Sequence, residues 1–401
     1  MGRTPTWITR ILHGPPNSNE GPHNPMKPSH APVPITRRRF IGAAAAALAV
    51  SPRRVLAAEA PPRGRRLGVA LVGLGSYSEG HLGPALRLSE HCALTGVVTG
   101  DRAKGERWAR EYGFPTRNIF GYDTMARMAG SPEIDAAYVV TPNGLHAQHC
   151  VAAAKAGKHV ICEKPMAVSV AECDAIIAAC RSAGVRLTVG YRLRYERHYA
   201  EFARIARDGD FGAFMRIEGA NGFEMGTPDA AESHWRTSKK LAGGGPLMDM
   251  GVYVIQAACM AKVEAAPVAV TAAFGPVTRP SLFSEVEESL KWTMEFADGA
   301  VATCRATYAE TVSTFRAEAA HGWARLDEPA FFYDDLVLTT SRGAVALPNV
   351  NHQVAQLDGM AVEILTGKPS LAPGEMGRRD IAVVEAIYAA AAGGGRSLVK
   401  A

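Results

Sequence analysis

Two short segments, far apart in the chain, carry the residue types that could do chemistry. Glu163-Lys164-Pro165 follows 158–162, a run with the pattern of a buried segment, and Asp249-Met250-Gly251-Val252-Tyr253 follows the glycines 243–245. A lysine, a carboxylate and a phenol in one cleft could move a proton while a bound nicotinamide takes a hydride. Lys164, Asp249 and Tyr253 are therefore the predicted catalytic residues.

Of these groups, the phenol requires a lowered pKa to act as a base. A tyrosine with its ordinary pKa near 10 is a poor base at neutral pH, and a cation within ~4–6 Å lowers that pKa. Tyr253 is predicted to transfer the proton, Lys164 to stabilise its anion and orient the reacting oxygen, and Asp249 to position the substrate or Lys164. Pro165 is expected to fix the turn through a cis bond. The alternatives are that Asp249 caps a helix, Tyr253 is a core aromatic and Lys164 a solvated charge.

From Arg66 onward, apolar runs alternate with helical patterns. Continuous apolar runs are typical of parallel strands covered on both faces. The predicted strands are 67–74, 93–99, 136–140, 160–162 and 185–190, and the predicted helices are 81–88, 102–112, 146–156 and 170–183. This order predicts a doubly wound parallel sheet, a Rossmann-type α/β domain over residues 66–190.

Residues 191–401 have a different pattern, with predicted strands at 214–219, 268–274, 287–297 and 300–308 and predicted helices at 353–366 and 378–391. Every other residue of 290–296 is apolar, and Asp298-Gly299 fits a tight hairpin turn. We expect an α+β substrate and oligomerisation domain with a large open, mostly antiparallel sheet. Since its own helices cover one face and self-association commonly covers the other, a homodimer or homotetramer is expected.

The end of the first predicted strand favours a dinucleotide. Gly73-Leu74-Gly75 is followed by Ser76 and Tyr77, and Ser78 stands where a third glycine would be. The first glycine permits a tight turn, and the second lets a pyrophosphate approach the backbone near a helix N-terminus. A GxG alone is weak, but this one lies between a strand and a helix. Gly73, Gly75, Ser76 and Tyr77 are predicted to contact the cofactor.

The end of the second strand favours NADP over NAD. An NAD enzyme usually has an acidic residue there. Here Thr99 and Gly100 leave room for a phosphate, which Arg102 and Lys104 could neutralise. Asp101 could still reach a ribose diol, and these charges could equally form the solvated start of a helix.

The basic residues are concentrated at the N-terminus. Residues 1–57 hold eight of the 44 Lys/Arg and one of the 39 Asp/Glu, which leaves 36 against 38 beyond them and a net charge of −2. Nothing in that balance favours nucleic acid. No run of eighteen apolar residues could span a bilayer.

The N-terminal segment fits an export signal. Thr36-Arg37-Arg38-Arg39-Phe40-Ile41 is followed by an Ala-rich stretch and by cleavage candidates at 55–58. We expect a twin-arginine signal peptide over 1–57, with translation starting at Met26, and a short arm at 58–65. The alternative is an alanine helix after a chance basic cluster. The twin-arginine machinery exports folded proteins, so a periplasmic protein that carries its cofactor with it is expected.

Seven cysteines show neither a CxxC pair nor histidines at metal-ligand spacing. Most of them stand among apolar residues, so they are predicted to be small core residues, with a disulfide left open and no metal site expected.

Taken in order, Gly73-Leu74-Gly75, Thr141-Pro142-Asn143 through His146, Glu163-Lys164-Pro165 and 249–253 resemble the glucose–fructose oxidoreductase/inositol dehydrogenase (Gfo/Idh/MocA) superfamily over residues 66–401. Many members have His where this chain has Tyr253. The tyrosine, the segment 241–248 and Gly190-Tyr191-Arg192 look most like the glucose–fructose and aldose–aldose oxidoreductases. One departure is the arm, which is much shorter here than in the glucose–fructose enzyme and puts the mode of oligomerisation in doubt.

The resemblance implies further contacts to cofactor and substrate from Tyr122, Thr141, Pro142, Asn143, His146, Glu163, Lys164, Arg192, Trp235, Arg236 and Tyr333. His146 could instead cap a helix, and Trp235 and Tyr333 could be core or interface aromatics. The implied activity is oxidation of an aldose at C1 to a lactone and reduction of a second aldose or ketose to an alditol, with NADP permanently bound. The alternatives are a sugar dehydrogenase with a dissociable cofactor and an exported NAD-dependent glycoside hydrolase.

Overall fold

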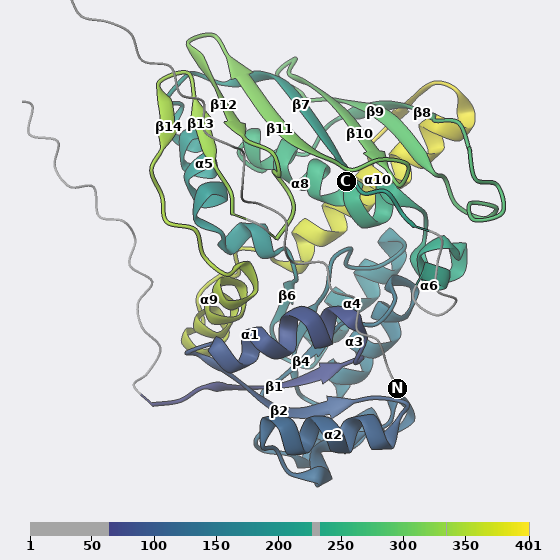
Figure 1. Cartoon of the computed structure of the whole chain (residues 1–401), viewed down its shortest axis with the longest axis vertical. Coiled ribbons are helices and arrows are strands. Elements are labelled where there is room, and N and C mark those ends of the chain that lie inside the picture. Colours follow the sequence, from purple (N-terminus) through teal and green to yellow (C-terminus); the bar gives the residue numbers. More distant parts are fainter. Residues whose placement is uncertain (1–63, 227–232, 334, 401) are drawn as a thin grey trace, which may run out of the picture. The chain divides into compact units, whose positions relative to one another are not determined.

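A six-stranded parallel sheet forms the first half of the chain (Figure 1). The computed structural model describes residues 64–226, 233–333 and 335–400, so the predicted leader and most of the predicted arm lie outside the described residues. The sheet order is β3-β2-β1-β4-β5-β6, and every neighbouring pair is parallel. The strands are β1 Leu67–Val72, β2 Cys92–Val98, β3 Ile119–Phe120, β4 Ala136–Val139, β5 His159–Cys162 and β6 Leu187–Val189. The predicted doubly wound sheet is confirmed.

Helices cover both faces of this sheet, which is why its strands are apolar throughout. All six residues of β1 and all four of β4 are buried. The helices and short η turns of this half are η1 Ser78–Leu82, α1 Gly83–Leu88, α2 Arg102–Tyr112, η2 Thr116–Asn118, η3 Tyr122–Gly130, η4 Asn143–Leu145, α3 His146–Lys155 and α4 Val170–Ser182. The strand order reverses between β1 and β4, so the carboxyl ends of these neighbouring strands open a crevice in which ligands of such folds bind.

A nine-stranded sheet forms the second half, in the order β14-β13-β12-β11-β7-β10-β9-β8-β15. The strands are β7 Phe214–Gly222, β8 Ala269–Phe274, β9 Ser289–Glu295, β10 Val301–Thr307, β11 Val312–Ala319, β12 Gly322–Leu326, β13 Leu338–Thr340, β14 Gly343–Val345 and β15 Arg396–Leu398. Its pairs are antiparallel except β7 with β10, which is parallel. The mostly antiparallel sheet is confirmed, and β11 to β15 are strands that the sequence patterns did not identify.

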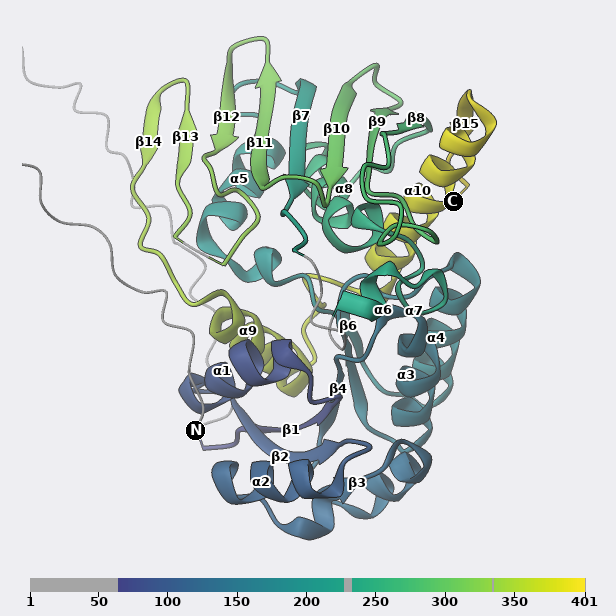
Figure 2. The same cartoon turned by 45° about the vertical axis from the view of Figure 1, so that its right-hand side comes forward.

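The two faces of this sheet differ sharply. Leu290, Trp292 and Met294 of β9 are buried, as the alternation predicted, and Gly299 turns into β10 with φ +84°. Helices α5 (Arg197–Asp208), α8 (Val252–Ala261) and α10 (Gly374–Gly393) cover that face (Figure 2). The opposite face carries charged residues, including the ion pair Arg216–Glu318. The expected oligomer stays a prediction, and a partner on this face would meet polar side chains.

Helices late in the chain return to the first half. α9 (His352–Thr366) places Leu357 and Met360 in the same apolar cluster as Leu67 of β1. α10 packs against both α4 and β8. The predicted domain boundary at residue 190 stays a prediction. Helices α9 and α10, far beyond that residue, pack against elements of the first half. None of the helices in the described part of the chain has both the length and the hydropathy to cross a membrane.

We expect Leu357→Ala to lower the free energy of unfolding by about 2–5 kcal/mol, since this side chain is fully buried between α9 and the parallel sheet. Chemical denaturation measures the loss. Leu88→Ala on α1, where the leucine is 65% exposed, is the matched control and should change the stability by no more than about 0.5 kcal/mol. Equal effects for the two variants would contradict the packing role of α9.

Candidate active site

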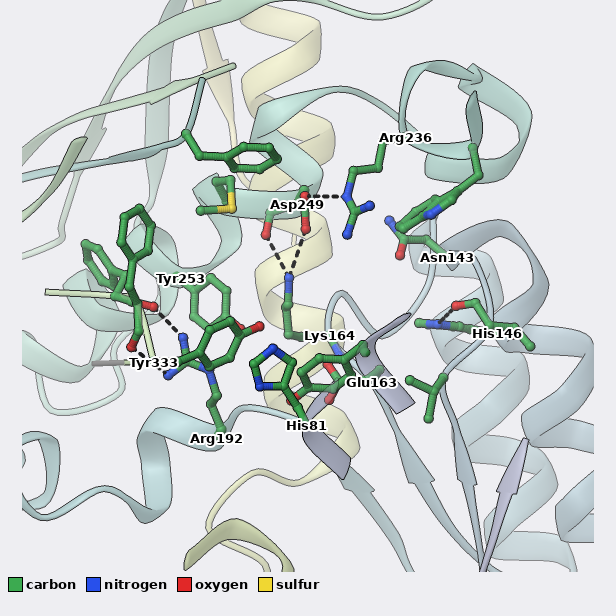
Figure 3. A pocket seen from close by; sticks show the side chains of 18 residues that line it. His81, Asn143, His146, Glu163, Lys164, Arg192, Arg236, Asp249, Tyr253 and Tyr333 are labelled. Carbon is green, nitrogen blue, oxygen red and sulfur yellow. Dashed lines mark hydrogen bonds and ion pairs between the residues drawn. The ribbon is translucent and has the colours of Figure 1, made fainter. Parts of the chain in front are cut away.

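A cavity of about 610 Å³ opens at the carboxyl edge of the parallel sheet (Figure 3). The loops after β1, β4 and β5 form one wall, and residues of the second half form the other. Twelve of the predicted site residues line it: Tyr77, Thr141, Asn143, His146, Glu163, Lys164, Arg192, Trp235, Arg236, Asp249, Tyr253 and Tyr333. The predictions missed His81, Val140, Phe223, Met250, Phe331 and Phe332, which also line it.

The three predicted catalytic residues lie together. Lys164 Nζ donates to Asp249 Oδ1 at 3.0 Å and to the Asp249 carbonyl oxygen at 2.9 Å. The same ammonium lies 4.7 Å from the centroid of the Tyr253 ring. Lys164 and Asp249 are only 12% and 14% exposed, so their attraction is poorly screened by water. Lys164 is thus a buried, paired cation rather than a solvated charge.

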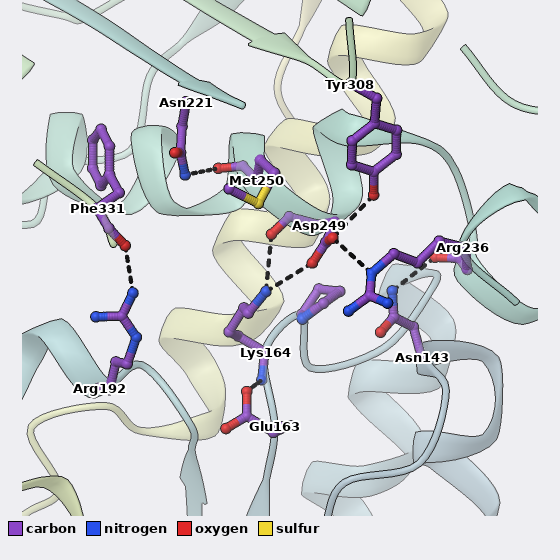
Figure 4. Close-up of polar contacts among 12 residues, drawn as sticks. Asn143, Glu163, Lys164, Arg192, Asn221, Arg236, Asp249, Met250, Tyr308 and Phe331 are labelled. Carbon is purple, nitrogen blue, oxygen red and sulfur yellow. Dashed lines mark hydrogen bonds and ion pairs between the residues drawn. The ribbon is translucent and has the colours of Figure 1, made fainter. Parts of the chain in front are cut away.

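Asp249 is held as a carboxylate by three donors (Figure 4). Besides Lys164, its Oδ2 accepts from Arg236 Nε at 3.1 Å and from the Tyr308 hydroxyl at 3.0 Å. Burial alone would raise the pKa of Asp249, but the charges of Lys164 and Arg236 hold it well below its ordinary value. Asp249 therefore accepts hydrogen bonds and positions Lys164; it has no proton to give. It does not cap a helix, because its partners are side chains.

Tyr308, directly after β10, is fully buried beneath Asp249. Sequence reasoning missed it, because Tyr308 was only the last residue of the predicted strand 300–308. Tyr253 is both a core aromatic and a pocket residue, since it is 5% exposed within α8 and still lines the cavity.

Hydrogen bonds of Glu163 hold the loop after β5 in place. The Lys164–Pro165 bond is cis, as expected. Glu163 accepts from the Tyr138 hydroxyl at 2.7 Å and from the Lys164 backbone N–H at 2.9 Å, and burial raises the pKa of its carboxyl. Gly190 permits the close approach, because a Cβ there would lie 2.6 Å from Glu163 Oε1.

His146 ties two loops together. Its Nδ1 lies 2.9 Å from the Pro165 carbonyl oxygen and its Nε2 2.7 Å from that of Thr141. Burial lowers the pKa of His146, but Cys162 and these carbonyl oxygens raise it overall, because only the protonated ring can donate to both. Both ring nitrogens of His146 are therefore occupied by backbone carbonyl oxygens. His146 supports the pocket wall and has no free nitrogen for the direct ligand contact that the resemblance implied.

The glycine turn after β1 fits a dinucleotide. Gly73 has φ +101°, a conformation that favours glycine, and a Cβ at Gly75 would meet nothing within 4 Å, so the backbone there is open to a ligand. Ser78 is fully buried and donates to the Gly73 carbonyl oxygen at 2.8 Å, which holds the turn in place of a third glycine. Ser76 and Tyr77 follow in the same turn.

The predicted phosphate grip beyond β2 lies outside the cavity, and its charges are already paired. The Asp101 carboxylate accepts from the Lys104 backbone N–H at 3.0 Å through Oδ1 and caps α2. Lys104 pairs with Glu79 at 3.1 Å, and Arg102 pairs with Glu106 at 3.1 Å. Gly100 borders the Tyr122 ring, which stacks on His149. Thr99 Oγ1 accepts from the Asp101 N–H.

Helix α6 (Ser233–Thr237) contributes Trp235 and Arg236 to the lining of the cavity, and α7 (Lys239–Ala242) follows it. Trp235 lies under its neighbour Arg236, with 4.6 Å from guanidinium carbon to ring centroid. Asn143 donates to the Ala242 carbonyl oxygen at 2.9 Å, which joins the loop after β4 to α7. Pro142 precedes η4 in this loop.

All seven cysteines are free and buried, as core residues would be. In the described ranges, no cluster of three or more His, Cys, Asp or Glu side chains could hold a metal ion.

A Rossmann-type sheet whose crevice ends at a lysine, a carboxylate and a phenol defines a nicotinamide-dependent oxidoreductase. Residues 67–191 match the oxidoreductase family with the NAD-binding Rossmann fold, and residues 199–323 match the GFO/IDH/MocA C-terminal domain. The chain belongs to the GFO/IDH/MocA family, which confirms the resemblance drawn from its motifs.

The chain is similar to sugar oxidoreductases. The aldose–aldose oxidoreductase from Caulobacter crescentus, crystallised with glycerol, shares 37% identity and a TM-score of 0.78, over 83% of this chain and 100% of that one. D-xylose 1-dehydrogenase [NADP(+)] of Haloarcula marismortui is 26% identical over 80% of this chain and 90% of its own. Levoglucosan dehydrogenase, in complex with NADH and levoglucosan, supports the fold alone, with 21% identity and a TM-score of 0.72 over 84% of this chain and 100% of that one.

We expect Asp249→Asn to flatten the acid side of the stability profile. Because folding lowers the pKa of Asp249, its ionised form stabilises the folded state above about pH 4, and this stabilisation is lost as the pH falls below that value. Denaturant unfolding between about pH 6 and 3 should therefore show a steeper loss for the wild type than for the variant. Asp123→Asn, at an exposed position, is the control and should leave the slope unchanged.

Proposed function

We propose that this protein is a sugar oxidoreductase with tightly bound NADP(H), which oxidises an aldose at C1 to a lactone and reduces a second aldose or ketose to an alditol. The observation that carries the proposal is the Lys164–Asp249–Tyr253 cluster at the nicotinamide end of the crevice. The similarity of the chain to the Caulobacter aldose–aldose oxidoreductase supports the use of two sugars in one catalytic cycle.

The bound dinucleotide supplies the hydride acceptor and later the hydride donor. In the oxidative half, the hydrogen on C1 leaves with the electron pair of the C1–H bond as hydride, and the proton of the C1 hydroxyl passes to the Tyr253 oxygen. Lys164 makes this step available because its charge stabilises the phenolate form of Tyr253 that takes the proton, and Asp249 holds Lys164 in place. In the reductive half the same groups work in reverse, so Tyr253 returns a proton to the oxygen of the second sugar.

NADP rather than NAD is proposed from the end of β2. One oxygen of the Asp101 carboxylate is engaged as a helix cap, so this side chain has less capacity to bind a ribose diol. Arg102, 59% exposed, and Lys104, 31% exposed, remain close enough to the surface to exchange their carboxylate partners for a phosphate. The name of the D-xylose 1-dehydrogenase relative is in keeping with this assignment.

Periplasmic location and a homo-oligomeric assembly also belong to the proposal. The first rests on the Arg37-Arg38-Arg39 motif and the Ala-rich segment after it. A folded protein exported with its cofactor needs no supply of NADP outside the cytoplasm, so permanent binding and twin-arginine export support each other.

We expect protein purified from the periplasm to release NADP, identified by mass spectrometry. Adding one aldose alone should reduce the bound cofactor by one equivalent and leave it reduced; a second sugar should reoxidise it and yield an alditol. Loss of cofactor on gel filtration, with turnover only on its addition, would indicate an ordinary dehydrogenase instead. Release of an aglycone without net reduction would indicate a hydrolase.

We expect Tyr253→Phe to lower kcat by roughly 10²–10⁴-fold with the bound cofactor retained, because the phenol is the proton carrier. Steady-state kinetics with the paired sugars measure the loss. Tyr195→Phe is the matched control, since its hydroxyl donates to Glu363 at 3.0 Å outside the cavity, and should keep near wild-type turnover. Unchanged turnover in Tyr253→Phe would overturn the assignment.

A further inference from the structure

Arg192 is a buried guanidinium without a carboxylate. The residue is 2% exposed, and among the described residues no Asp or Glu side chain lies within ion-pair distance of it. Its Nη1 donates to the Phe332 carbonyl oxygen at 3.2 Å and to His352 Nδ1 at 2.8 Å, and its Nη2 donates to the Phe331 carbonyl oxygen. Its Nε has no partner. A charge taken from water normally requires an opposite charge, and here every acceptor is neutral.

The acceptors leave the positive charge in place. Burial and the charge of Arg192 lower the pKa of His352 to about 4, so its ring is neutral at ordinary pH and accepts through Nδ1. Burial would lower the pKa of Arg192, but the neighbouring tyrosines, Tyr253 first among them, raise it. The guanidinium therefore stays protonated.

Tyrosines surround this cation. The guanidinium carbon lies 4.2 Å from the centroid of the Tyr333 ring and 5.3 Å from that of Tyr253 (Figure 3). On its other side, Tyr333 stacks on His81 with 4.4 Å between centroids. Tyr253 thus lies between two cations, since Lys164 Nζ is 4.7 Å from its ring centroid.

The two cations are not equivalent. The charge of Lys164 is shared with Asp249 at 3.0 Å, whereas that of Arg192 is not offset by any carboxylate contact among the described residues. We propose that Arg192 is the second cation that stabilises the tyrosinate form of Tyr253 and that the tyrosinate is the counter-ion of Arg192. Arg192 acts through Tyr253, so it is a positioning residue rather than a catalytic one. This inference rests on the proposed function only for its kinetic readout.

Other titratable groups face this pair from the elements packed around it: Tyr77 after β1, Glu163 and Lys164 after β5, Tyr199 on α5, Tyr333 after β12 and His352 at the start of α9. Asp249 lies one turn before Tyr253. The two carboxylates of this set oppose a negative charge on the phenol, and only Lys164 and Arg192 favour it.

The kinetic test is Arg192→Gln in the holoenzyme, with Arg197→Gln on the exposed start of α5 as the matched control. We expect the acid limb of the pH–kcat profile to move up by about one pH unit or more, since one of the two cations within ~5 Å of the Tyr253 ring centroid is removed. KM should change little, and activity should recover at alkaline pH. Arg192→Lys, which keeps the charge, should return the acid limb most of the way to its wild-type position. A profile parallel to that of the wild type at every pH would overturn the proposal.

A second measurement needs no sugar. The tyrosinate absorbance of the holoenzyme is titrated with and without Tyr253→Phe, so that the difference reports Tyr253 alone. We expect this difference band to form at lower pH in the wild-type background than in the Arg192→Gln background, and an unchanged midpoint would overturn the inference. If the midpoint shifts but no sugar pair is turned over, the proposed function fails and the role of Arg192 stands. If sugars are turned over but the midpoint is unchanged, the proposed function stands and the role of Arg192 fails.

Discussion

The ion pair between Lys164 and Asp249 is the contact on which the site depends. Lys164 comes from the loop after β5 and Asp249 from the turn before α8, so the pair joins the parallel sheet to the second half across the cavity. Losing either partner would strand a buried charge, which is costly. Because Arg236 and Tyr308 bind the other carboxylate oxygen, the lysine can move little, and its ammonium stays beside the Tyr253 ring.

Backbone geometry prepares the rest of the pocket. Gly73 and Gly75 leave the backbone at the carboxyl end of β1 open to a dinucleotide, and the hydrogen bond from Ser78 to the Gly73 carbonyl oxygen stabilises this turn. His146 bridges the loops after β4 and β5, so these two loops of the same wall are tied together. Rigid support of this kind keeps reacting groups within the small tolerances that proton and hydride transfer require.

The sequence alone predicted the parallel sheet and the cluster of Lys164, Asp249 and Tyr253, because apolar runs and strand-end motifs are local signals. It could not predict Tyr308, whose role depends on a contact with Asp249 across 59 positions. Strands β11 to β15 were missed because most of them are short and only partly buried. Likewise, the pairing of Lys104 with Glu79 depends on which helices meet, whereas Arg102 and Glu106 stand at i,i+4 on α2, a spacing that the sequence already contains.

Helix α9 connects late residues to the earliest core. Gln356 donates to the Tyr138 hydroxyl, which in turn donates to Glu163, and Leu357 fills the layer beside β1. A nascent chain that has not yet emerged beyond residue 366 therefore lacks the α9 side chains of the apolar layer beside β1. The core of the first half is therefore completed only after most of the second half has been synthesised.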